Sequence, residues 1–114
     1  MPQPRRLGSD REDEAAQYLL SLGWTLLGRR LKLTHGEIDV AAMDGAVLVI
    51  VEVKARRRGR ALDSFTPVKA KRLRKGALEF IEKFGMPTDT PIRFDLVLFD
   101  GANMTHLVDV IRSD

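Results

Sequence analysis

Residues 37–54 read EIDVAAMDGAVLVIVEVK. Two runs of β-forming residues, 37–43 and 46–54, lie on either side of the dipeptide Asp44-Gly45. Asp-Gly is typical of a two-residue type I′ turn, so the sequence predicts a tight antiparallel hairpin. Both runs are rich in Val, Ile and Ala, and we therefore expect this hairpin to form the centre of a β-sheet.

The predicted turn determines which residues of the hairpin face one another. The facing pairs are expected to be Met43–Ala46, Asp39–Ile50 and Glu37–Glu52. Side chains alternate between the two faces of a strand. One face is then entirely aliphatic and should be buried, with Ile38, Val40, Ala42, Val47, Val49, Val51 and Val53. The other face carries four charged residues at its open end, which are Glu37, Asp39, Glu52 and Lys54.

This charged corner does not favour sheet formation, because like charges on facing strands repel each other. Facing carboxylates are, however, the ligands that a hard divalent cation such as Mg²⁺ requires. Lys54 shares a face with Glu52, so it can reach a metal-bound water or a phosphate oxygen. The sequence thus predicts a metal site at Asp39 and Glu52. A salt bridge between Lys54 and Glu52 or Glu37 is the alternative interpretation.

The rest of the chain predicts an α/β fold with a mixed sheet flanked by helices, in the order α-β-β-β-α-β-β. Ser9 and Glu12 match a capping box at the start of the first helix, and Thr66-Pro67 match an N-cap and first residue of the second. The expected helices are residues 10–22 and 67–84, and the expected strands are residues 24–33, 37–43, 46–54, 92–99 and 104–111.

The chain has 114 residues and no cysteine, which predicts one domain over residues 1–114 without a disulfide or a thiol nucleophile. Residues 1–8 are expected to be disordered. The longest uncharged apolar run is far shorter than the roughly 18 residues of a membrane span, so we expect a cytoplasmic protein without a membrane partner.

The net charge of +3 is unevenly distributed along the sequence. Residues 54–75 hold ten basic residues and one acid, a local charge of +9, whereas the other 92 residues sum to −6. A compact basic surface binds phosphate groups, and a dispersed one is merely solvated. Because the block begins directly after Lys54, we expect it to bind nucleic acid through Arg56, Arg57, Arg58, Arg60, Lys69, Lys71, Arg72 and Lys75.

The spacing Asp39, twelve residues, then Glu52-Val53-Lys54 resembles the PD-(D/E)xK core of restriction-endonuclease-like nucleases. More specifically, the motifs GEID at 36–39, VIVEVK at 49–54 and RFD at 93–95 resemble the bacterial family UPF0102, also called YraN. Arg56, Thr66, Lys69, Arg72 and Leu73 also match it, and the resemblance extends over residues 8–97. Arg11 and Arg30 stand where glycine and asparagine are common in the family, away from the acidic corner.

The resemblance implies a restriction-endonuclease-like fold related to Holliday junction resolvases, and an endonuclease activity on DNA with Mg²⁺ or Mn²⁺. It also implies Glu12, Asp39, Glu52 and Lys54 as the nuclease quartet. From its place in the charged corner, we expect Glu37 to support the same site. The Val53 carbonyl would join the metal ligands, and a homodimer follows by analogy. Branched recombination or repair intermediates are the implied substrates.

Several alternatives remain open on the residues themselves. Glu12 either closes a capping box or points to the acidic corner. Asp95 is either a further acid beside the site or, as we favour, the partner of Arg93. A non-catalytic nucleic-acid-binding protein with the same fold is the second functional hypothesis. A protein-interaction module with an ion-pair network is the third.

Overall fold

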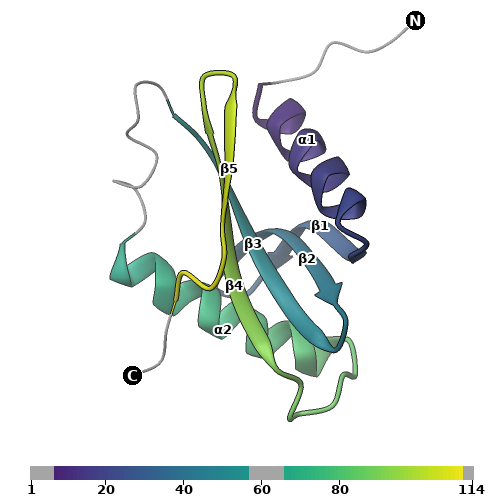
Figure 1. Cartoon of the computed structure of the whole chain (residues 1–114). Coiled ribbons are helices and arrows are strands. Elements are labelled where there is room, and N and C mark those ends of the chain that lie inside the picture. The colour runs from purple at the N-terminus through teal and green to yellow at the C-terminus, as the bar shows by residue number, and fades with distance from the viewer. Residues whose placement is uncertain (1–6, 57–65, 112–114) are drawn as a thin grey trace, which may run out of the picture.

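The computed structural model describes residues 7–56 and 66–111, with two helices and five strands in that part (Figure 1). Their order, α-β-β-β-α-β-β, confirms the predicted α/β fold. The elements are α1 (Leu7–Ser21), β1 (Thr25–Leu33), β2 (Gly36–Asp44), β3 (Val47–Arg56), α2 (Pro67–Lys83), β4 (Ile92–Asp100) and β5 (Asn103–Leu107). Neither described helix has the length and apolarity that crossing a membrane requires.

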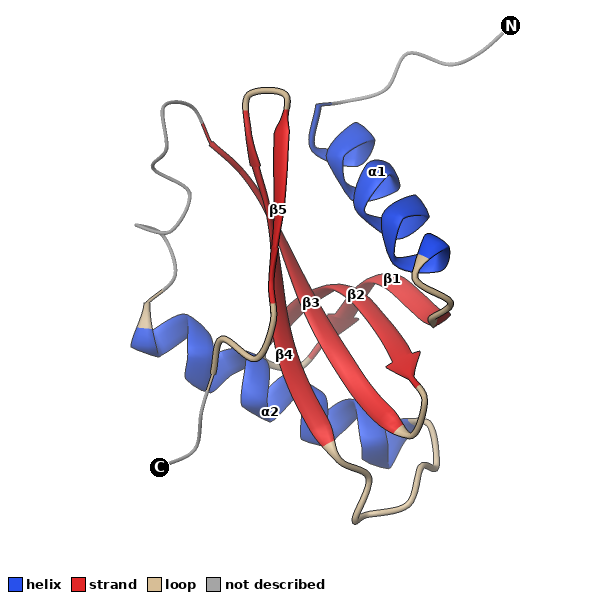
Figure 2. Ribbon diagram, in the orientation of Figure 1, coloured by secondary structure: helices blue, strands red, loops and turns tan. Residues whose placement is uncertain are grey.

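The five strands form one mixed sheet in the order β1-β2-β3-β4-β5. Three neighbouring pairs are antiparallel, and β3 pairs in parallel with β4 because helix α2 connects them. Figure 2 shows α1 and α2 on opposite sides of the strands, with α2 crossing behind the sheet. Each face of the sheet is therefore covered by one helix.

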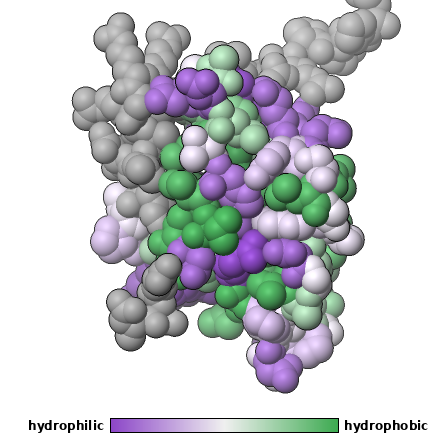
Figure 3. Space-filling view, viewed as in Figure 1, coloured by the Kyte–Doolittle hydropathy of each residue, from purple (hydrophilic) through white to green (hydrophobic). Residues whose placement is uncertain are grey.

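Each helix covers its own core cluster. Leu73, Ala77 and Phe80 of α2 pack on Ile38, Ala41, Leu48, Ile50 and Phe94. Ala15 and Leu19 of α1 pack on Val40, Ala42, Val49, Val51, Val97 and Phe99. In the view of Figure 3, hydrophilic side chains lie between hydrophobic areas over the middle of the molecule. The sheet is thus buried on both faces.

The hairpin register differs from the prediction by two residues. Asp44 pairs with Val47 and Val40 with Val51, so the turn consists of Gly45-Ala46. Gly45 has φ of 61°, which suits the first central residue of a type II′ turn. Asp44 stays in β2, where its carboxylate accepts from Arg93 Nη1 at 3.1 Å. The predicted pairs Glu37–Glu52 and Asp39–Ile50 were therefore wrong.

The prediction that Ile38 and Val40 share a face was also wrong, because β2 changes face between these two residues. Ile38 packs in the α2 cluster, whereas Val40 packs in the α1 cluster. In β1, Arg29 pairs with Asp13 of α1, whereas Leu31 packs on the α2 side. Arg30 lies between them with φ of 49°. Both strands thus change face at the level of Arg30 and Asp39, which simple alternation could not reveal.

Two element ends also differ. Helix α1 begins at Leu7, so Ser9 lies inside the helix and not at a capping box. Residues 1–6, where most of the predicted disorder falls, lie outside the described residues, and residues 7–8 are helical. Strand β5 ends at Leu107, not at residue 111, because Asp109 has φ of 60° and its N–H turns to Asp95.

Candidate metal centre

Strands β2 and β3 separate at one end, and the predicted charged residues lie at this strand fork. Their last antiparallel pair is Val40 with Val51, so Asp39 and Glu52 are the next residues beyond it. Strand β3 continues alongside β4 as far as Arg56, whereas β2 continues alongside β1. The two-residue shift of the register therefore puts Asp39 at the level of Glu52.

Asp39 fills the gap between the separating strands. Its Oδ2 accepts a hydrogen bond from the backbone N–H of Val53 at 2.9 Å. Carboxylate oxygens of Glu12, Glu37 and Asp39 all lie within 4.8 Å of one another. Because α1 supplies Glu12 and β2 supplies the other two, the fork brings together side chains that are distant in sequence. With Glu52, these residues are called the acidic cluster below.

The pKa of Asp39 is raised to about 7. Burial is the main cause, and the nearby charge of Glu52 adds to it, with a smaller effect of Glu12. The hydrogen bond from Val53 acts in the opposite direction. Asp39 is thus a carboxylate whose charge is poorly compensated in this structure, and a bound cation would stabilise its ionised form.

Glu52 is buried, with a side chain that is 6% exposed, and two lysines approach it. The Nζ of Lys54 lies 3.5 Å from Glu52 Oε2. Lys69, from the first turn of α2, forms a closer ion pair with the same oxygen. The sequence predicted Lys69 as part of the nucleic-acid surface, and its contact with Glu52 was not predicted.

The two lysines differ in their electrostatics. Burial lowers the pKa of Lys54, and the neighbouring Lys69 lowers it further, against the attraction of Glu52. Burial also acts to lower the pKa of Lys69, but its contacts with Glu52 and the charge of Asp39 raise it overall. Lys69 is therefore the cation that neutralises Glu52, whereas Lys54 is the lysine suited to proton transfer or water binding.

Glu12 belongs to the fork and not to a helix cap. Its side chain is 18% exposed, and its Oε1 accepts from Arg30 Nε at 2.6 Å. The same contact with Glu12 raises the pKa of Arg30. Of the two interpretations of Glu12, the structure thus favours the one in which this residue faces the acidic corner.

The donor set at the fork fits a hard divalent cation. Glu12, Glu37 and Asp39 offer carboxylate oxygens, the ligands that Mg²⁺ and Mn²⁺ prefer over nitrogen and sulfur. Asp39 and Glu52 lie next to each other at the strand ends, but the carboxylate oxygens that lie within 4.8 Å of one another are those of Glu12, Glu37 and Asp39. Within the described residues, the arrangement is a site that could hold such an ion.

A basic surface adjoins the fork along α2. Lys71, Arg72 and Lys75 are exposed there, and with His35 and Val68 they line a hollow of about 290 Å³. A smaller hollow of about 30 Å³ lies between Arg72 and Glu37, with Lys69 and His35 also in its wall. The predicted basic helix is therefore continuous with the acidic cluster.

Gly36 allows this close approach of α2 to β2. It has φ of 139°, and a Cβ at this position would lie 2.9 Å from Arg72 Cδ. The side chain of Arg56 and the predicted nucleic-acid-binding residues Arg57, Arg58 and Arg60 fall outside the described part. The structure thus describes the α2 part of the predicted basic surface.

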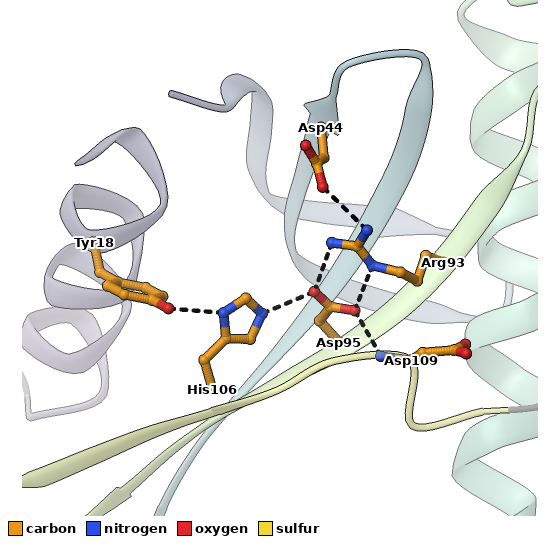
Figure 4. A network of polar contacts seen from close by, with 6 residues as sticks. All are labelled: Tyr18, Asp44, Arg93, Asp95, His106 and Asp109. Carbon is orange, nitrogen blue, oxygen red and sulfur yellow. Dashed lines mark hydrogen bonds and ion pairs between the residues drawn. The ribbon is translucent and has the colours of Figure 1, made fainter. Parts of the chain in front are cut away.

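Asp95 lies in a separate polar network (Figure 4). Its carboxylate accepts from Arg93 Nε at 3.0 Å, from Arg93 Nη2 at 3.1 Å and from the Asp109 N–H at 3.0 Å. His106 Nε2 lies 2.8 Å from Asp95 Oδ2, and its Nδ1 lies 2.9 Å from the Tyr18 hydroxyl. The favoured pairing with Arg93 is therefore confirmed, and His106 is a partner that sequence spacing could not indicate.

The chain is similar to proteins that share one family name. The uncharacterised protein family UPF0102 matches residues 11–99. The UPF0102 protein HEAR0176 of Herminiimonas arsenicoxydans is 39% identical over 110 residues, covering 94% of this chain and 87% of that protein. A UPF0102 protein of Acidothermus cellulolyticus is 41% identical over 103 residues, covering 80% and 78%. These names state no activity. The chain belongs to the uncharacterised protein family UPF0102.

Proposed function

We propose that this protein is a metal-dependent endonuclease that hydrolyses phosphodiester bonds of DNA with a restriction-endonuclease-like site. The observation that carries the proposal is the strand fork, where the acidic cluster, Lys54 and the basic surface of α2 adjoin one another. Glu12 and Asp39 are half-buried and Glu37 is exposed, and like charges this close repel one another, so their convergence favours a binding role.

Asp39 and Glu52 would hold Mg²⁺ or Mn²⁺, together with the backbone carbonyl of Val53. Glu12 and Glu37 would support that ion, because each has a carboxylate oxygen within 4.8 Å of one of Asp39. When bound, the ion supplies an activated water as nucleophile and positive charge for the phosphate group. The protein residues then determine where that water is held and which phosphate it faces.

Lys54 has the role of orienting or deprotonating the water, or of neutralising charge that develops on the phosphate. Its lowered pKa supports this role, because burial makes its proton easier to release. Its contact with Glu52 fixes the ammonium group beside the acidic cluster.

Lys71, Arg72 and Lys75 would bind the DNA backbone along the exposed side of α2. Such contacts give affinity and position but carry little sequence information. A substrate chosen by shape, such as a branched recombination or repair intermediate, is therefore the one that we propose.

The test is cleavage of plasmid, single-stranded and four-way-junction DNA by the purified protein in Mn²⁺. Asp39→Asn, Glu52→Gln and Lys54→Ala should each lower the rate about 100-fold or more, because each removes a group from the site. Glu82→Gln, an exposed acid of α2, serves as the matched control and should cut like the wild type. Equal cleavage by Glu52→Gln and wild type would refute the assignment.

Binding without cleavage would favour the second hypothesis, a non-catalytic nucleic-acid-binding protein. In that case the affinity for duplex DNA falls with salt, with a log–log slope of about −0.9 for each phosphate neutralised. Lys75→Gln should reduce that slope by about one unit if Lys75 contacts a phosphate.

A further inference from the structure

Lys69 occupies a helix position that does not favour a lysine. Thr66 is the N-cap of α2, and its Oγ1 accepts from the Lys69 N–H at 3.2 Å, which makes Lys69 the third residue of the helix. The helix dipole favours acids in this first turn, and a capping box has Glu or Gln at the same position. The first turn of α2 contains no acid. The reason for a lysine must therefore lie outside the helix.

The contact of Lys69 with Glu52 supplies that reason. Its ammonium group forms an ion pair with Glu52 Oε2, the oxygen that Lys54 also approaches at 3.5 Å. The side chain of Lys69 is 22% exposed and that of Glu52 is 6% exposed, so water screens this pair only in part. Without Lys69, the buried Glu52 would retain the more distant contact with Lys54.

We propose that Lys69 is a positioning residue that neutralises Glu52 while the site holds no divalent cation, and that it leaves Glu52 when such a cation binds. The inference rests on the proposed metal site and concerns a residue that the proposed chemistry does not use. Lys69 and the divalent cation would compete for the same oxygen of Glu52. The lysine therefore weakens metal binding while it stabilises the empty site.

After its release from Glu52, the ammonium group of Lys69 would lie beside the basic hollow of α2. Lys69 lines the small hollow together with Arg72 and His35, and Arg72 and His35 also line the basic hollow with Lys71 and Lys75. An ammonium group released from Glu52 thus lies next to the surface that we propose binds the DNA backbone. Metal binding would in this way add one cation to that surface.

The experiment measures Mn²⁺ affinity from the electron paramagnetic resonance signal of free Mn²⁺, without DNA and without cleavage. The variants are Lys69→Met and Lys69→Gln, which remove the charge, and Lys69→Arg, which retains it. Lys83→Met, at the exposed last turn of α2, is the matched control for loss of one positive charge. Circular dichroism verifies the fold of each variant.

We expect both charge-removing variants to bind Mn²⁺ about tenfold more tightly than the wild type, because a neighbouring positive charge is removed. Lys69→Arg and Lys83→Met should stay within about twofold of the wild type. Two charge-removing variants keep the test decisive if one of them fails to fold.

The result separates this inference from the proposed function. If wild-type protein binds no Mn²⁺, the metal site itself is wrong, and the inference fails with it. If the wild type binds Mn²⁺ and folded Lys69→Met or Lys69→Gln binds it equally or more weakly, the metal site stands and the role of Lys69 is overturned.

Discussion

Asp39 on β2 and Asp95 on β4 are both aspartates of the same sheet, on either side of β3, but their surroundings differ. Asp95 is fully buried and receives hydrogen bonds from Arg93 and the Asp109 N–H, with His106 at 2.8 Å. Asp39 receives a bond from the Val53 N–H and lies among other carboxylates.

The difference separates a structural carboxylate from a candidate functional one. A buried charge with donors on all sides stabilises the arrangement of the elements that supply them. Asp95 in this way holds Arg93, β5 and the segment after β5 together. Burial and the surrounding acidic cluster raise the pKa of Asp39, so its ionised form does not stabilise the fold in this way. The strand fork is therefore the candidate site for binding a cation.

The largest expected effect on stability is at Asp95. Asp95→Ala removes the buried carboxylate that accepts from Arg93, whose contact with Asp44 remains, and leaves the Asp109 N–H without this acceptor, so the free energy of unfolding should fall by about 3–5 kcal/mol. Urea unfolding measures this change. Asp89→Ala, an exposed aspartate, should stay within about 0.5 kcal/mol of the wild type. A small effect of Asp95→Ala would show that the network does not stabilise the fold.

In contrast to Asp95→Ala, Asp39→Asn should raise the free energy of unfolding at pH 8. The pKa of Asp39 is about 7 in the folded protein, against an ordinary value of 3.8. Ionisation of Asp39 is therefore less favourable in the folded protein than in the unfolded chain, so the free energy of unfolding falls as the pH rises through this range. Asparagine does not titrate. Asp39→Asn should therefore be about 2 kcal/mol more stable than the wild type at pH 8, and closer to it at pH 4.

Urea unfolding of both proteins across this pH range tests the sign. A variant that is less stable than the wild type at pH 8 would show that Asp39 stabilises the fold, as Asp95 does. Mg²⁺ should stabilise the wild type at pH 8 and have a much smaller effect on the variant, since the cation compensates the charge that asparagine lacks.

The smallest of these effects concerns Thr66, which fixes the start of α2 and so the position of Lys69. Thr66→Ala loses the N-cap and should lower the free energy of unfolding by about 1 kcal/mol. Thr66→Ser retains a hydroxyl and should behave like the wild type in thermal unfolding. Equal stability of Thr66→Ala and Thr66→Ser would mean that this cap is not needed to position Lys69.

The order of elements could be predicted from the sequence because each element has a local signal. Helix α2 has an N-cap and a regular apolar stripe, and β3 begins with the β-forming run VLVIV. The turn at Asp44-Gly45 was misplaced because Asp44 is held in β2 by Arg93, which is 49 residues away. No local pattern contains that contact.

The residues of the fork were predicted, but the way they meet was not. Alternation assigned Asp39 and Glu52 to one corner, yet the two-residue register shift and the change of face at Arg30 determine their actual positions. Lys69 was missed as a partner of Glu52. The signal was that Lys69 occupies a helix position that favours acids. It was missed because the basic residues of this block were interpreted as one surface.

Whether the strand fork binds a divalent cation is tested by measuring Mn²⁺ binding to the wild type, Asp39→Asn and Asp89→Asn at pH 7.5. We expect the wild type and Asp89→Asn to bind Mn²⁺ with the same Kd, and Asp39→Asn to bind at least about tenfold more weakly, because it loses a charged ligand. Equal Mn²⁺ affinity of the wild type and Asp39→Asn would contradict it, because the strand fork would then not be the metal site.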